Sequence, residues 1–80
     1  MDYTDSPAVC ARKAARAAKP GEPSPGARSI VNYCNEALLD HVVLPGGMRL
    51  IRRGQHLRAL ELYHERLARR GGSHKKAVPT

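Results

Sequence analysis

Apolar residues recur at helical spacing in three stretches of the chain, and the first stretch is short and rich in alanine. Its apolar positions lie three or four residues apart, as on one face of a helix; they are Ala8, Ala11, Ala15 and Ala18. Ser6 is a favourable N-cap, and Pro7 suits the first helical position. We therefore predict a helix over residues 7–18. Its small side chains form a shallow apolar face, so we expect it to dock weakly on the rest of the protein.

The second and third stretches are longer and carry larger side chains. Residues 29–43 have an amphipathic stripe, formed by Ile30, Cys34, Ala37, Leu38, His41 and Val42. Residues 55–70 have a similar stripe, formed by Leu57, Leu60, His64 and Leu67. Pro45-Gly46-Gly47 follows the second stretch and Gly71-Gly72 follows the third, and both are helix stop signals. We predict one helix over each stretch.

The remaining segments are rich in Pro, Gly or polar residues. Three prolines and two glycines fall within residues 19–26, so this stretch is predicted to be a loop. Residues 1–6 and the basic tail 73–80 are predicted to be disordered, because neither contains an apolar pattern. An 80-residue chain has room for one domain at most. We place a single small helical domain at residues 7–72.

The predicted fold is mainly α, with helices at about 7–18, 29–43 and 55–70, and the last two form an antiparallel pair. Residues 48–53 leave one alternative open, because they fit either the start of the third helix or a short strand between two glycines. In the strand interpretation, the fold is a small winged helix with a β-hairpin around residues 45–56.

One segment resembles a known family. Residues 44–53, followed by Leu57-Arg58-Ala59-Leu60, are similar to the wing and last helix of excisionase-type proteins. The resemblance implies a winged helix and a regulatory role. The chain departs from the family in two places. The last helix has only Tyr63 where the family has an aromatic anchor, and the loop 19–26 is longer than a tight helix-turn-helix allows.

The distribution of charge along the chain says more about binding partners than the overall composition does. The protein has 14 basic and 7 acidic residues, which give a net charge of +7. Residues 1–40 contain five of each sign, so the whole excess falls in residues 41–80, with nine basic and two acidic side chains. Such a field attracts polyanions. The chain has no Phe or Trp, so its core is aliphatic and thin, which favours a homodimer or folding onto a partner.

The basic residues after Gly47 form the candidate site. They are Arg49, Arg52, Arg53, Arg58, Arg66, Arg69 and Arg70. Several arginines on one surface can contact phosphates, which predicts a small nucleic-acid-binding accessory or regulatory protein. The alternative is a small protein-binding modulator, such as a phage- or plasmid-type inhibitor or adaptor. In that case the basic face would dock on an acidic or nucleic-acid-binding surface of a larger target.

Catalytic, metal and cofactor sites are not indicated by the sequence. Cys10 and Cys34 lie 24 positions apart, and neither has the close second ligand that a zinc site needs. Cys34 and His41 would be two helical turns apart, too far for a nucleophile and its base. No phosphate-binding loop motif is present. We therefore expect no enzyme activity, no metal and no cofactor. The polar start and the absence of a long apolar run predict a cytoplasmic protein that does not bind membranes.

Overall fold

The fold combines three helices with a small antiparallel sheet. The computed structural model describes the backbone of residues 2–77 and the side chains of residues 2–69. The elements, in chain order, are β1 (Tyr3–Asp5), α1 (Pro7–Ala17), α2 (Ala27–Asn35), β2 (His41–Val43), β3 (Arg49–Arg52) and α3 (Gln55–Ala77). The protein is therefore mixed α/β, which corrects the mainly α prediction.

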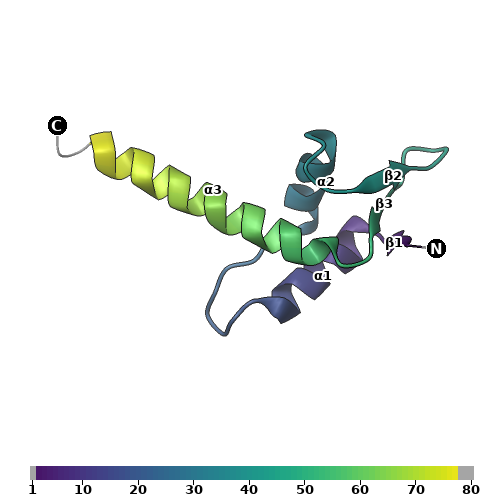
Figure 1. The fold of residues 1–80 in the computed structure, drawn as a ribbon, viewed down its shortest axis with the longest axis horizontal. Helices are drawn as coiled ribbons and strands as arrows, with labels where there is room; N and C mark the ends of the chain where they lie inside the picture. Colours follow the sequence, from purple (N-terminus) through teal and green to yellow (C-terminus); the bar gives the residue numbers. More distant parts are fainter. Residues whose placement is uncertain (1, 78–80) are drawn as a thin grey trace.

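The sheet lies at one end of the molecule, and α3 extends away from it (Figure 1). Its strand order is β1-β3-β2, and both pairings are antiparallel. β3 is the central strand, with Val42 paired with Leu50 on one side and Tyr3 paired with Arg52 on the other. Both outer strands are short, so most of the stability must come from packing against the helices.

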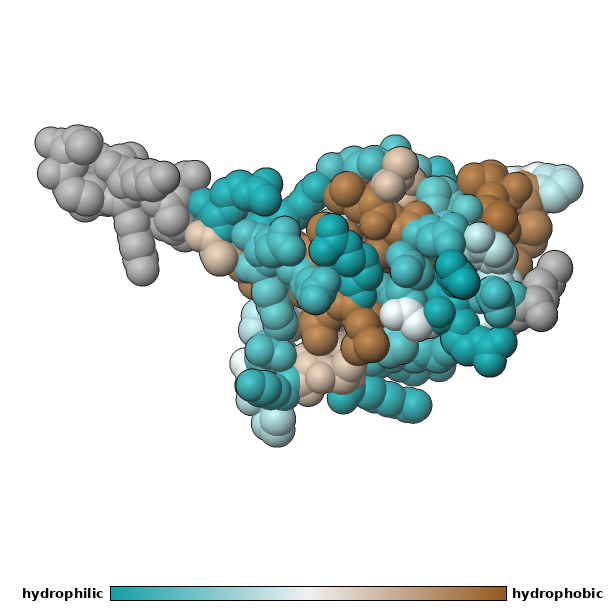
Figure 2. Space-filling model, viewed as in Figure 1, coloured by the Kyte–Doolittle hydropathy of each residue, from teal (hydrophilic) through white to brown (hydrophobic). Residues whose placement is uncertain are grey.

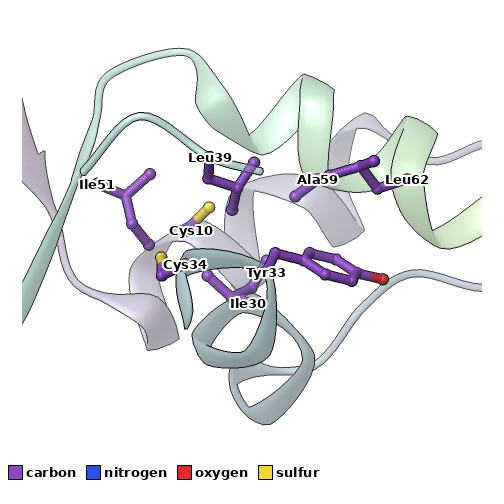
Figure 3. Packing of buried hydrophobic residues seen from close by; sticks show 8 residues of the cluster. All are labelled: Cys10, Ile30, Tyr33, Cys34, Leu39, Ile51, Ala59 and Leu62. Carbon is purple, nitrogen blue, oxygen red and sulfur yellow. The ribbon is translucent and has the colours of Figure 1, made fainter. Parts of the chain in front are cut away.

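The core is a single cluster between the sheet and the three helices (Figure 3). Its buried side chains come from every helix, from β3 and from the segment before β2; they are Cys10, Ile30, Tyr33, Cys34, Leu39, Ile51, Ala59 and Leu62. Ile51 is fully buried and is the only one of them that the sheet supplies. Apart from Tyr33 and the two cysteines, the cluster is aliphatic, as the composition predicts.

The first helix is confirmed, but its weak docking is not. Ser6 accepts a hydrogen bond from the backbone N–H of Val9 at 3.3 Å, which is the predicted N-cap. Cys10 and Ala14 are fully buried, and α1 packs against both α2 and α3. The buried face is not the predicted one, because Ala8 and Ala15 are exposed whereas Cys10 and Ala14 are buried. The small side chains on this other face allow α1 to pack closely against its neighbours.

The predicted helix over residues 29–43 is wrong in its second half. α2 ends at Asn35, and Ala37 adopts the left-handed conformation at φ 59°. The Leu38 N–H donates to the Tyr33 carbonyl at 2.9 Å, and the Ala37 N–H donates to the Cys34 carbonyl at 3.0 Å. These two bonds form a Schellman cap, which usually has Gly or Asn at the left-handed position. Alanine gives no such signal, so the apolar stripe suggested a continuous helix. The predicted antiparallel pair of this helix with α3 is also wrong, because α2 and α3 each pack mainly against α1.

Within residues 48–53, Arg49–Arg52 form strand β3, so the strand interpretation of this segment is correct. β2 and β3 make a hairpin whose strands span His41–Val43 and Arg49–Arg52, slightly earlier than the predicted 45–56. The turn closes with a hydrogen bond from the Leu44 N–H to the Met48 carbonyl at 2.7 Å. Gly46 and Gly47 have φ of 100° and 90°, where a side chain would be strained.

Both ends of the chain differ from the expected disorder. Tyr3–Asp5 form β1, and the buried carboxylate of Asp5 pairs with the Lys13 ammonium at 3.0 Å, which ties β1 to α1. α3 begins at Gln55 as predicted but continues through Gly71-Gly72 to Ala77. The predicted tail therefore overlaps the end of α3, and its last residues, 78–80, lie outside the described part. No helix among the described residues is long and apolar enough to cross a membrane.

Candidate nucleic-acid interface

Arg52 and Arg53, at the end of β3, lie beside carboxylates from the first half of the chain. Arg52 is 3.3 Å from Asp40 and 4.0 Å from Asp2, and Arg53 is 3.9 Å from Asp2. The Arg53 N–H also donates to the Asp2 carbonyl at 2.6 Å. Asp40 accepts a further bond from the Tyr3 hydroxyl at 3.0 Å, which raises the pKa of Tyr3. The two arginines are thus partly neutralised by local acidic groups.

Arg66 holds a carboxylate more tightly than any other predicted site residue. Its guanidinium donates two hydrogen bonds to Glu36, at 2.6 and 3.2 Å, and stacks over the Tyr33 ring with its carbon 5.2 Å from the ring centroid. The hydrogen bonds lower the pKa of Glu36 and raise the pKa of Arg66. Burial raises the pKa of Tyr33. Arg66 therefore links α3 to the end of α2.

The remaining predicted residues are placed differently. Arg58 pairs with Glu61 at 3.3 Å and with Glu65 at 3.8 Å along α3. Arg49 lies on β3 and donates to the side-chain oxygen of Asn35 at 2.5 Å, which joins the hairpin to the end of α2. Arg69 is exposed on α3, and the side chain of Arg70 lies outside the described residues. Among the six with described side chains, Arg49, Arg52 and Arg53 lie in or at the end of β3, and Arg58, Arg66 and Arg69 lie on α3.

Among the side chains of residues 2–69, most cationic groups without an ion pair come from the first half of the chain. Within residues 2–69, four cationic side chains from that half make no ion pair or hydrogen bond; they are Arg12, Arg16, Lys19 and Arg28. Arg12 and Arg16 lie one turn apart on α1, on the side away from buried Cys10 and Ala14. Three acids from residues 1–40 thus lie against arginines of residues 41–80, namely Asp2, Glu36 and Asp40.

The exposed face of α2 was missed by the sequence analysis. Ile30, Tyr33 and Cys34 bury one side of this helix. The opposite side presents Arg28, Asn32 and Asn35, which are exposed and lie at i, i+4 and i+7. Polar residues at helical spacing opposite the apolar stripe could have identified it.

A pocket of about 180 Å³ adjoins this face between α2 and α3. Its lining includes Ser29, Asn32 and Tyr33 of α2 and Tyr63, Arg66 and Leu67 of α3. Small-molecule sites usually enclose about 300–1,000 Å³ and are mostly apolar. This pocket is smaller and more polar than such sites, so we describe it as a shallow surface depression beside α2 and not as a ligand site.

The two cysteines are packing residues in the core. Cys10 and Cys34 are free thiols, and both are buried. Burial raises the pKa of Cys10 to about 11 and also raises the pKa of Cys34. Reactive cysteines need a lowered pKa and access to solvent. Among the residues that the structure describes, no group of three or more His, Cys, Asp or Glu side chains could hold a metal ion.

Comparison of the chain with protein-family models, with curated proteins and with solved structures finds no match.

Proposed function

We propose that the protein is a small regulatory protein that binds duplex DNA through the exposed face of α2, with Arg49 of the hairpin beside it. The observation that carries the proposal is the set Arg28, Asn32 and Asn35 on one helix face, joined to Arg49 through the contact with Asn35. These side chains project from a helix that is held from behind by its buried residues.

The chemistry of this face suits the major groove. An α-helix fits into that groove, where Arg makes two hydrogen bonds to guanine and Asn makes two to adenine. In helix-turn-helix proteins the second helix enters the groove while the first lies across the backbone. α1, the loop 18–26 and α2 supply two such helices, and the β2–β3 hairpin follows as a wing would. The proposed arrangement is therefore a winged helix.

Affinity would come from cations that are free to meet phosphates. Arg12, Arg16 and Lys19 have no carboxylate partner among the described side chains, so phosphate contact would not require an ion pair to break. Arg52, Arg53, Arg58 and Arg66 already lie near acidic side chains. We therefore assign them a smaller share of the binding, and we keep Arg69 and Arg70 as phosphate contacts from α3. The proposed role is non-enzymatic and cytoplasmic.

The test is selection of a preferred duplex from a random pool, followed by titration of that duplex at several salt concentrations. Asn32→Ala should reduce the preference at one position of the site, by about 1–3 kcal/mol per lost bidentate contact. Arg58→Ala is the matched control on α3 and should leave the preference unchanged. If the protein binds no duplex even at low salt, the proposal fails, and the protein-binding alternative becomes the hypothesis to test.

A further inference from the structure

The β2–β3 hairpin carries an apolar surface that the proposed DNA contact does not use. Val43 and Met48 are each 58% exposed, and Val42 and Leu44 are 36% and 37% exposed. Figure 2 shows apolar surface at this end of the molecule. No Asp, Glu, Lys or Arg occurs from His41 to Met48, although charged residues make up 26% of the chain. Contiguous apolar surface on a small protein marks an interaction site.

The outer edge of β2 is also unpaired. The Leu44 N–H donates to the Met48 carbonyl, and the Arg52 N–H donates to the Asp40 carbonyl. Backbone groups alternate direction along an antiparallel strand, so positions 40, 42 and 44 face β3. The N–H and C=O groups of His41 and Val43 therefore point away from the sheet, where β2 has no neighbouring strand. An open edge of this kind can pair with another strand.

We propose that β2 pairs with β2 of a second copy of this chain, which forms a symmetric homodimer with a continuous six-stranded sheet. Antiparallel pairing centred on Val42 places His41 opposite Val43 of the second copy. Because both residues direct their backbone groups outward, the register allows four hydrogen bonds between the chains. Val42 then lies opposite Val42 of the second copy, at a non-hydrogen-bonded position where side chains approach most closely.

Charge favours a second copy as the occupant of this edge. Two molecules with a net charge of +7 repel each other over most of their surfaces. The hairpin segment 41–48 contributes no charge, so like molecules can approach there at the lowest electrostatic cost. The strand pairing involves only the three residues of β2 in each chain, so we expect weak association that strengthens as salt screens the remaining charge. The proposal does not depend on DNA binding.

The experiment is analytical ultracentrifugation of the full chain, from about 20 μM to about 1 mM, in the range expected for a small interface. The wild-type protein should shift from monomer to dimer, whereas Val42→Lys and Val42→Glu should each remain monomeric. A mixture of these two variants should associate again, because Lys and Glu then face each other. Restored association cannot come from a variant that has simply unfolded.

Leu57→Lys supplies the matched control. Leu57 is 56% exposed on α3, so this substitution adds the same charge as Val42→Lys, but outside the hairpin. It should associate like the wild type. In NMR spectra, the amides of His41 and Val43 should become protected from exchange as concentration rises. A wild-type protein that stays monomeric throughout this range would overturn the proposal. So would a Leu57→Lys variant that associates as poorly as Val42→Lys, or a mixture of the two Val42 variants that does not associate.

Discussion

Arg66 of α3 and Glu36 at the end of α2 are joined by two hydrogen bonds, although they lie 30 residues apart in the sequence. Glu36 is the C-cap residue of α2, so the pair fixes the point where that helix ends relative to α3. The guanidinium also covers the ring of Tyr33, whose side chain belongs to the core. One side chain of α3 thus holds both the cap and the buried face of α2.

We predict that Glu36→Gln lowers the unfolding midpoint at neutral pH. The Arg66 hydrogen bonds depress the pKa of Glu36 below its ordinary value of 4.5, so the ionised carboxylate stabilises the folded state above that pH. This contribution should disappear as the pH falls through the lowered pKa. Thermal unfolding at pH 7 and at about pH 3 measures the difference between variant and wild type. Glu61→Gln, which disrupts a pair within α3, should have a smaller effect; an equal effect would contradict the prediction.

We predict that Ala37→Gly stabilises the protein by about 1 kcal/mol, because alanine pays a steric cost in the left-handed conformation that glycine does not. Ala37 is exposed at φ 59°, so no core contact is lost. Urea unfolding measures the change. The matched control is Ala15→Gly on the exposed side of α1, which should destabilise by about 1 kcal/mol. If both substitutions destabilise to the same extent, residue 37 does not occupy the cap that we describe.

We predict that Ile51→Ala is strongly destabilising, by about 2–5 kcal/mol. Ile51 is 0% exposed and joins the central strand to the helices, so its truncation leaves a cavity at the junction. Leu57→Ala removes an aliphatic side chain that is 56% exposed and should change stability by less than about 1 kcal/mol. The free energy of unfolding in urea provides the comparison. Similar losses for the two variants would show that the sheet does not pack on the helices as described.

We predict that both thiols resist modification in the folded protein. The reacting species is the thiolate, and raising the pKa of Cys10 from 9.0 to about 11 reduces its thiolate fraction at pH 8 about a hundredfold. Burial limits access as well. Labelling with a thiol-reactive dye should be slow in buffer and fast in denaturant. Variants with Cys10→Ala or Cys34→Ala report on the remaining cysteine. Labelling of either native thiol at the rate of a small free thiol would contradict its place in the core.

The sequence predicted the parts of the fold that depend on local chemistry. Ser6-Pro7 identified the start of α1, and the residues after Gly54 identified the start of α3. The predicted apolar stripe of α3 is wrong at Leu57, which is 56% exposed, because the buried residues among the described side chains of this helix are Ala59 and Leu62. The end of α2 was not predictable in the same way, because Ala37 adopts a conformation that alanine rarely signals. β1 was missed because three residues carry no periodic pattern, and only pairing with β3 makes them a strand.

The candidate site shows a different limit. Arg52 and Arg66 were identified from their charge, but their partners Asp40 and Glu36 lie at least 12 residues away and are brought near only by the fold. The sum of charges over a segment cannot detect such pairing. The face of α2 has a pattern that the sequence does contain, in Arg28, Asn32 and Asn35, but its significance depends on which side of the helix is buried.

The pairing of acids and arginines across the chain has a consequence for work with fragments. Residues 41–80 taken alone carry nine basic and two acidic side chains, a charge of +7 on half the length. In the intact protein, Asp2, Glu36 and Asp40 lie against arginines of that half. A peptide of residues 41–80 would therefore adhere to polyanions such as heparin more strongly than the whole protein, and would exaggerate the affinity of the native surface. The affinity of the folded protein for polyanions should therefore be measured on the 80-residue chain.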